Sequence, residues 1–102
     1  MKKIRVRNMQ SSNGNCVPNQ FIIESFPEGA YRFKTSTFQS YSTIIARKVY
    51  DVEAHTVSIV LDKNSWDYSV TTGKYRNQFL SEGIAETRKK IASGEYKLVD
   101  LN

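Results

Sequence analysis

"TVSIVLDKNSWDYSVTTGKYRNQFL", residues 56–80, changes its hydrophobic period part-way along its length. Val57, Ile59 and Leu61 alternate with polar residues, which is the pattern of a strand that turns one face to a core. After residue 70 the alternation stops and apolar residues recur at helical spacing instead. The stretch therefore predicts a strand followed directly by a helix, and a fold that mixes both.

The helix predicted from residue 71 has two distinct faces. Tyr75, Phe79 and Leu80 form its inner face, and either Thr71 or Thr72 supplies the N-cap. The residues expected on its outer face are Lys74, Arg76, Asn77 and Gln78.

The N-terminal half reads as strands. In "KIRVR", residues 3–7, two aliphatic residues alternate with three basic ones, as in a strand with one face on the core and one in solvent. Residues 21–26 and 31–38 flank "PEGA", a hairpin signal, and residues 10–20 are expected to form a long loop. Residues 42–54 have helical spacing but many β-branched residues, so we favour a strand over 41–50 and a turn at 51–55.

The C-terminal segment adds a second helix and a last strand. Acids come early and bases late in "EGIAETRKKIAS", which suits the helix dipole, and Glu86 and Lys90 form an i,i+4 pair. Gly94 stands where a left-handed C-cap belongs, and "EYKLVDL" alternates as a short strand. We therefore predict a single α+β domain over residues 1–102, with a small antiparallel sheet of about five or six strands and one or two C-terminal helices on one face.

The chain is basic and ordinary in other respects. It holds 15 Lys and Arg against 10 Asp and Glu, a formal charge of +5 with a pI near 9.4. Such an excess favours nucleic acid or the acidic face of a protein as partner, although plain solubility explains it equally well. The lone Cys16 excludes an internal disulfide and fits a reducing compartment. With no secretory signal or apolar span, we expect a soluble protein of the cytoplasm.

The usual catalytic and metal chemistries lack their residues. His55 is the single histidine and lies in an expected turn, and Asp62 and Asp67 are better explained as caps or turn acids. "TTGKYR" lacks the upstream glycine of a phosphate-binding loop, although its helix start could hold a phosphate weakly. We therefore expect no enzyme, no metal site and no cofactor.

Recognition of a macromolecule is the remaining hypothesis. Tyr68 and Tyr75 offer stacking surfaces beside cations, whereas Trp66 and Phe79 are better explained as core residues. The candidate partner-binding residues are Lys3, Arg5, Arg7, Arg32, Lys34, Tyr68, Lys74, Tyr75 and Arg76. If the strands share one sheet, the first five could lie on one face, although each could instead solvate its own strand.

Four stretches carry a resemblance to known proteins: "NQFII", "FQSYSTIIA", "WDYSVTTGKYRNQFL" and "ETRKKIASGEYKLVDLN", most specifically residues 38–41 and 66–80. Together they resemble a family of small single-domain proteins of unknown function from bacteriophages and prophages. "RKVYDVEAH" is longer than such proteins would lead one to expect between the two central strands. The resemblance implies an accessory protein of a phage or mobile element in the bacterial cytoplasm, and it carries no catalytic residue across.

Three functional hypotheses follow. The first is a non-catalytic accessory protein that binds nucleic acid or the nucleic-acid-processing machinery of the host. The second is an anti-defence inhibitor, of the anti-CRISPR kind, that binds a host protein directly. The third is a phosphate- or nucleotide-binding enzyme that uses the turn at residues 71–74.

Overall fold

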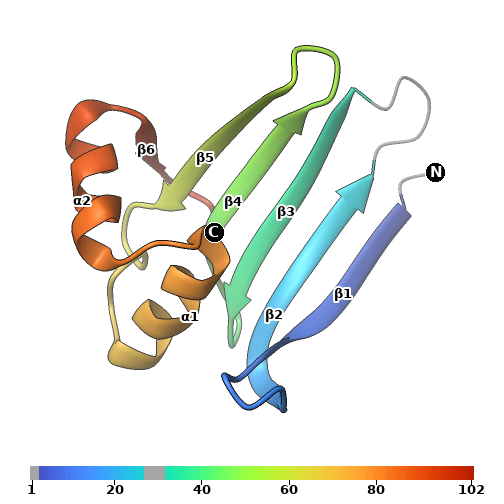
Figure 1. The fold of residues 1–102 in the computed structure, drawn as a ribbon, viewed down its shortest axis with the longest axis vertical. Helices are drawn as coiled ribbons and strands as arrows, with labels where there is room; N and C mark the ends of the chain where they lie inside the picture. The colour runs from blue at the N-terminus through green and yellow to red at the C-terminus, as the bar shows by residue number, and fades with distance from the viewer. Residues whose placement is uncertain (1–2, 27–31) are drawn as a thin grey trace.

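A computed structural model describes residues 3–26 and 32–102, which form six strands and two helices (Figure 1). This confirms the α+β class. The elements in chain order are β1 (Lys3–Gln10), β2 (Cys16–Phe26), β3 (Phe33–Ser40), β4 (Thr43–Asp51), β5 (Thr56–Asp62), α1 (Val70–Leu80), α2 (Ile84–Ser93) and β6 (Tyr96–Val99).

The six strands form one sheet in the order β1-β2-β3-β4-β5-β6. Neighbours from β1 to β5 are antiparallel, as expected for strands joined by short connections, but β5 and β6 are parallel. The prediction of an antiparallel sheet was therefore wrong for the last pair. Both helices lie between β5 and β6, and this crossover returns the chain to the end of the sheet where β5 began.

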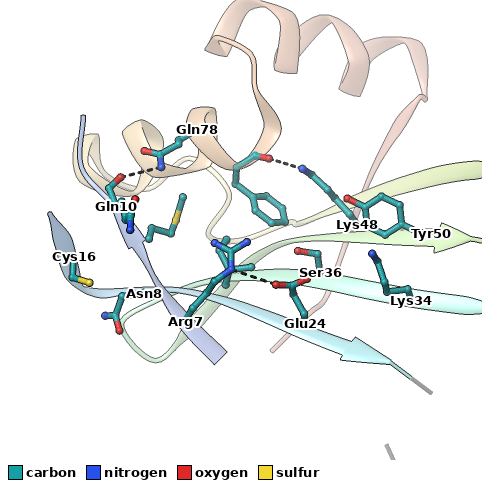
Figure 2. A pocket seen from close by; sticks show the side chains of 13 residues that line it. Arg7, Asn8, Gln10, Cys16, Glu24, Lys34, Ser36, Lys48, Tyr50 and Gln78 are labelled. Atoms are coloured by element: carbon teal, nitrogen blue, oxygen red, sulfur yellow. Dashed lines mark hydrogen bonds and ion pairs between the residues drawn. The ribbon is translucent and has the colours of Figure 1, made fainter. Parts of the chain in front are cut away.

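The register of the strands sorts their side chains onto two faces. Ile22, Phe38, Ala46 and Leu61 are cross-strand partners and lie on the side that carries the helices, here called the helix face. The neighbouring row, which begins with Ile23, points the other way, onto what we call the open face. Figure 2 shows α1 above the helix face, with the side chains of Arg7, Lys34 and Lys48 on the side of the sheet that faces it.

The core lies between α1 and the helix face. Phe38 is fully buried and its ring packs on that of Phe79, with 5.9 Å between centroids. Tyr75 and Leu80 are also buried, so the predicted inner face of α1 is confirmed. The hydroxyl groups of Ser40 and Thr72 are joined by a hydrogen bond of 3.2 Å, which fixes the start of α1 on the end of β3.

The apolar residues of two strands are more exposed than their alternation predicts. Leu61 is fully buried, but Val57 is 53% exposed because α1 and α2 do not reach that end of β5. Ile4 and Val6 were expected to face the core, yet they are 59% and 62% exposed. Their strand lies at the sheet edge and turns them to the open face, where no described element covers them.

The ends of the helices follow local chemistry. Ser69 caps α1, since its hydroxyl accepts from Thr72 N at 3.1 Å, so the predicted caps Thr71 and Thr72 lie two and three residues too late. Gly94 ends α2 at φ 84°, which confirms the left-handed C-cap.

Strand boundaries are close to those predicted except near residue 16. The strand over 41–50 and its turn are confirmed by β4, whereas the loop expected over 10–20 is shorter because β2 already begins at Cys16. A bulge interrupts the β1–β2 register between Asn8 and Gln10. The predicted turn at "PEGA" lies outside the described residues.

A buried polar cluster joins α2 to β6. The Glu82 carboxylate accepts hydrogen bonds from Lys90 Nζ at 2.7 Å, Thr87 Oγ1 at 2.7 Å and Tyr96 Oη at 2.8 Å. Burial opposes ionisation of Glu82, but these three donors outweigh it and lower its pKa. The i,i+4 spacing had indicated a Glu86–Lys90 pair. In the structure Lys90 pairs with Glu82, and Glu86 pairs with Lys89.

Replacing Phe38 by Ala should lower the free energy of unfolding by about 3–5 kcal/mol, because the cavity beside Phe79 cannot fill from solvent. Chemical denaturation measures the loss. Tyr68→Ala removes an aromatic side chain that is 53% exposed and should change stability by about 0.5 kcal/mol or less. Equal losses in the two variants would contradict this placement of the core.

Stability should depend on the charge of Glu82. Its pKa is lowered from the usual 4.5, so its contribution is present above that pH and is lost as the pH falls through the lowered value. Glu82→Gln should be less stable than the native chain at pH 7, and the gap should narrow below about pH 4.5. Denaturant titrations across this range measure it, with the exposed Glu86→Gln as control. A gap that stays constant with pH would rule out the linkage.

Candidate functional site

An open cleft of about 590 Å³ lies on the helix face beside α1 (Figure 2). Its floor comes from β1–β4 and its wall from the last turn of α1, where Gln78 donates to Gln10 O at 3.0 Å. The cleft forms because α1 covers only one end of the sheet, and the strands extend beyond it. The lining residues include Arg7, Asn8, Glu24, Lys34, Ser36, Lys48, Tyr50 and Gln78.

Lys34 lies on the floor of this cleft, and its ammonium group is close to two aromatic rings. Its Nζ lies 5.4 Å from the ring centroid of Phe26 and 5.1 Å from that of Tyr50, within the range of cation–π attraction. Within residues 3–26 and 32–102, no carboxylate lies within 4.0 Å of this ammonium group. Lys34 therefore keeps its charge available to a ligand.

The basic residues of β1 point to the same side. The register pairs Lys3 with Phe26 and Arg5 with Glu24, so both cations lie on the helix face at the sheet edge. Arg7 is 63% exposed, and its Nε lies 3.3 Å from Glu24 Oε1. That ion pair holds Arg7 over the cleft without burying its guanidinium.

Lys48 adds a further cation to the lining of the cleft, and it was not among the predicted site residues. Its Nζ donates to Phe79 O at 2.6 Å and lies 4.4 Å from the Phe79 ring centroid. Burial lowers the pKa of Lys48, and the nearby charge of Glu82 opposes that change. The alternation of side chains along a strand could have found it. Once residues 43–51 form a strand, Lys48 and Tyr50 must lie on the same face.

Arg32 does not contribute a free charge to the cleft. Its guanidinium lies 3.2 Å from Asp51 Oδ2 and 3.2 Å from Glu53 Oε2, so two carboxylates at the β4–β5 turn neutralise it. The hydrogen bond from Arg32 is the largest cause of the lowered pKa of Asp51. This residue fixes a turn and has little charge left for a partner.

Arg76 was expected on the outer face of α1, but it is 2% exposed. It donates to Trp66 O at 2.7 Å, Asp67 Oδ1 at 3.1 Å and Asn77 Oδ1 at 3.0 Å, and its guanidinium lies 5.4 Å from the Trp66 ring centroid. Gly73 packs beside it, and an added Cβ there would make an ordinary contact with Arg76 Nη2 at 3.5 Å. Arg76 therefore anchors the loop before α1 and is not a surface cation.

The remaining predicted residues on α1 are separated from the cleft. Tyr75 is buried in the core, so it offers no stacking surface. Lys74 and Tyr68 are exposed and border a second, shallower hollow at the start of α1. The structure thus brings together Lys3, Arg5, Arg7 and Lys34 and leaves the four predicted residues of the loop and helix elsewhere.

The candidate acid–base residues either lie exposed in a turn or hold other segments of the chain in place. His55 lies exposed in the β4–β5 turn at φ 56°. Asp62 is buried and accepts hydrogen bonds from the Ser65 hydroxyl and from Leu101 N at 2.9 Å, which ties the C-terminal residues to β5. In the described part of the chain, no three His, Cys, Asp or Glu side chains gather as metal ligands would.

Residues 4–95 match the model of a protein family described as a family of unknown function, DUF8033. The chain belongs to this family. No curated protein and no solved structure matches this chain. None of the described helices has the length and apolar character needed to cross a membrane. The family assignment agrees with the unknown-function part of the resemblance and carries no activity with it.

Replacing Arg76 by Met should cost about 1–3 kcal/mol of stability, because the hydrogen bonds from the buried guanidinium to Trp66 O and Asp67 Oδ1 are lost. Lys74→Met removes the same charge from an exposed position of the same helix and should change stability by about 0.5 kcal/mol or less. Thermal and chemical denaturation compare the two variants. If Arg76→Met were as stable as Lys74→Met, the anchoring role would be wrong.

Proposed function

We propose that this protein is a non-catalytic binding module that holds a single strand of nucleic acid along the cleft on its helix face. The observation that carries the proposal is the convergence of basic residues from three strands on one exposed surface. These residues are Lys3, Arg5, Arg7, Lys34 and Lys48. We call this set the basic cluster.

The charge balance of the basic cluster favours an anion. Among the described residues that line the cleft, Glu24 is the single acid, and it is already paired with Arg7. Lys34 and Arg5 are left to attract phosphate groups, and such contacts dominate the affinity of proteins for nucleic acid. The field is concentrated in a concave site with low-dielectric walls, which strengthens it.

The neutral groups of the cleft favour an unpaired strand. Tyr50 and Phe26 lie next to Lys34, and aromatic rings beside cations are the means by which proteins hold single strands. Ser36 adds a hydroxyl group that can bond to sugar or base, and Gln78 adds an amide oxygen, because its amide nitrogen already donates to Gln10 O. No base-specific arrangement is implied, so we expect weak sequence preference.

The biological setting of the proposal comes from the resemblance to small phage and prophage proteins. An accessory protein of a mobile element would use such a module on nucleic acid or on the machinery that processes it. The proposal assigns the protein no reaction and no cofactor.

Binding to labelled single-stranded DNA and RNA should weaken steeply as salt rises, because phosphate contacts release counterions. The double variant Arg5→Gln, Lys34→Gln should bind at least about tenfold more weakly at low salt and reduce the salt slope by about 1.4, that is 0.7 for each lost contact. Fluorescence anisotropy measures both quantities.

The matched control is Lys97→Gln, which removes an exposed cation from the open face and should leave binding unchanged. Circular dichroism checks that each variant is folded. Absence of binding at low ionic strength would overturn the proposal. A nuclease-resistant complex with a host protein in place of nucleic acid would favour the inhibitor hypothesis instead.

A further inference from the structure

The outer edge of β1 presents unpaired backbone groups. Figure 1 shows β1 at the edge of the sheet, and among the described strands β2 alone pairs with it. In a strand that is paired on one side only, every second residue directs its N–H and C=O groups away from the sheet. Residues 3–8 are all exposed, and their pairing with β2 is regular until the bulge after Asn8. This edge therefore has the geometry needed to accept another strand.

Most sheet edges carry features that prevent such pairing. Proteins use short edge strands, proline, bulges, covering loops or charged side chains for this purpose. β1 is eight residues long, contains neither proline nor glycine, and has its bulge near its C-terminal end. Charge is therefore the protective feature that remains.

The side chains of β1 form one charged row and one apolar row. Lys3, Arg5 and Arg7 lie on the helix face, whereas Ile4 and Val6 lie on the open face and are 59% and 62% exposed. An edge that served only to repel other strands would have no need of an apolar row, because polar side chains suit a solvated face better. Exposed aliphatic side chains next to unpaired backbone groups are the combination that an added strand covers.

The charged row selects against a second copy of this chain. If two copies of β1 paired in antiparallel fashion with matching faces, Lys3, Arg5 and Arg7 would lie opposite the same cations of the other copy. Like charges directly opposite one another destabilise a strand pair, whereas opposite charges stabilise it. Among the described residues, no carboxylate lies within 4.0 Å of Lys3 or Arg5. The complementary partner is therefore acidic.

We infer that β1 pairs through its outer edge with an extended segment of another protein, in which acidic residues alternate with aliphatic ones. Because side chains alternate along a strand, the acids of that segment would lie beside Lys3 and Arg5, and its aliphatic residues would cover Ile4 and Val6. Backbone hydrogen bonds supply the affinity and the two rows supply the specificity. This inference goes beyond nucleic-acid binding in the cleft and does not depend on it, because the added strand lies beside β1 and not above the sheet.

The test titrates two synthetic peptides with blocked ends into the full chain, under reducing conditions because Cys16 is exposed. The alternating peptide is Glu-Val-Glu-Val-Glu-Val and the block peptide is Glu-Glu-Glu-Val-Val-Val, so their charge and composition are equal. The alternating peptide should bind with a dissociation constant on the order of 100 µM. The block peptide should bind at least about tenfold more weakly, because it places acids on both faces of the strand.

Amide hydrogen exchange, followed by NMR, locates the contact. At about 1 mM, the alternating peptide should slow exchange by about tenfold at every second amide of residues 3–8. It should leave the amides of β6, at the opposite edge of the sheet, unchanged. Simple attraction to basic side chains would not produce this alternation along β1. Sedimentation of the chain without peptide should give the monomer mass of 11.7 kDa.

Reversing the charges should reverse the preference. The double variant Lys3→Glu, Arg5→Glu should lose the alternating Glu peptide and bind Lys-Val-Lys-Val-Lys-Val instead. The matched control, Lys74→Glu, Lys97→Glu, changes the net charge equally at exposed positions away from β1 and should keep the original preference. Circular dichroism checks that both variants fold, and the exchange pattern of the native chain remains decisive if one does not. The inference fails if both Glu peptides bind equally, if neither binds at about 1 mM, if exchange slows outside β1, or if the chain alone is a dimer.

Discussion

The packing of Phe79 on Phe38 determines how much of the sheet the helices can cover. α1 is short, and it is fixed at one end by Ser69 and Thr72 and at the other by Lys48, whose ammonium group bonds to the last turn. The helix therefore covers one end of the helix face and leaves the other end of β1–β4 open. The cleft is the direct result, because its floor is the part of the sheet that a longer helix would have buried. Lys48 both stabilises the helix end and contributes charge to the cleft.

Much of the fold was predictable because hydrophobic period and cap residues are local signals. The change of period within residues 56–80 placed β5 and α1, and Gly94 marked the end of α2. The parallel pairing of β6 was not predictable in this way, since it depends on how two helices carry the chain back across the sheet. The exposure of Ile4 and Val6 was equally hidden, because alternation shows that a strand has two faces without showing which one is covered.

The positions of the candidate site residues could be predicted only in part, and the division has a physical reason. Lys3, Arg5, Arg7 and Lys34 follow strand parity, so their common side emerged once the strands shared a sheet. Arg76 could not be distinguished from Lys74 by sequence, although one is buried and the other exposed. That difference depends on acceptors contributed by Trp66 and Asp67. Arg32 was likewise neutralised by carboxylates that the β4–β5 turn brings into reach.

The regular alternation of β1 upstream of the bulge between Asn8 and Gln10 limits which mutations the strand can tolerate. β1 supplies alternate residues to opposite sides of the sheet, so deleting or inserting one residue upstream of the bulge would exchange the two sets at once. Arginines would then project where valine and isoleucine now stand, and aliphatic groups would enter the cleft. Single-residue insertions and deletions in residues 3–8 should therefore be far less tolerated than substitutions there.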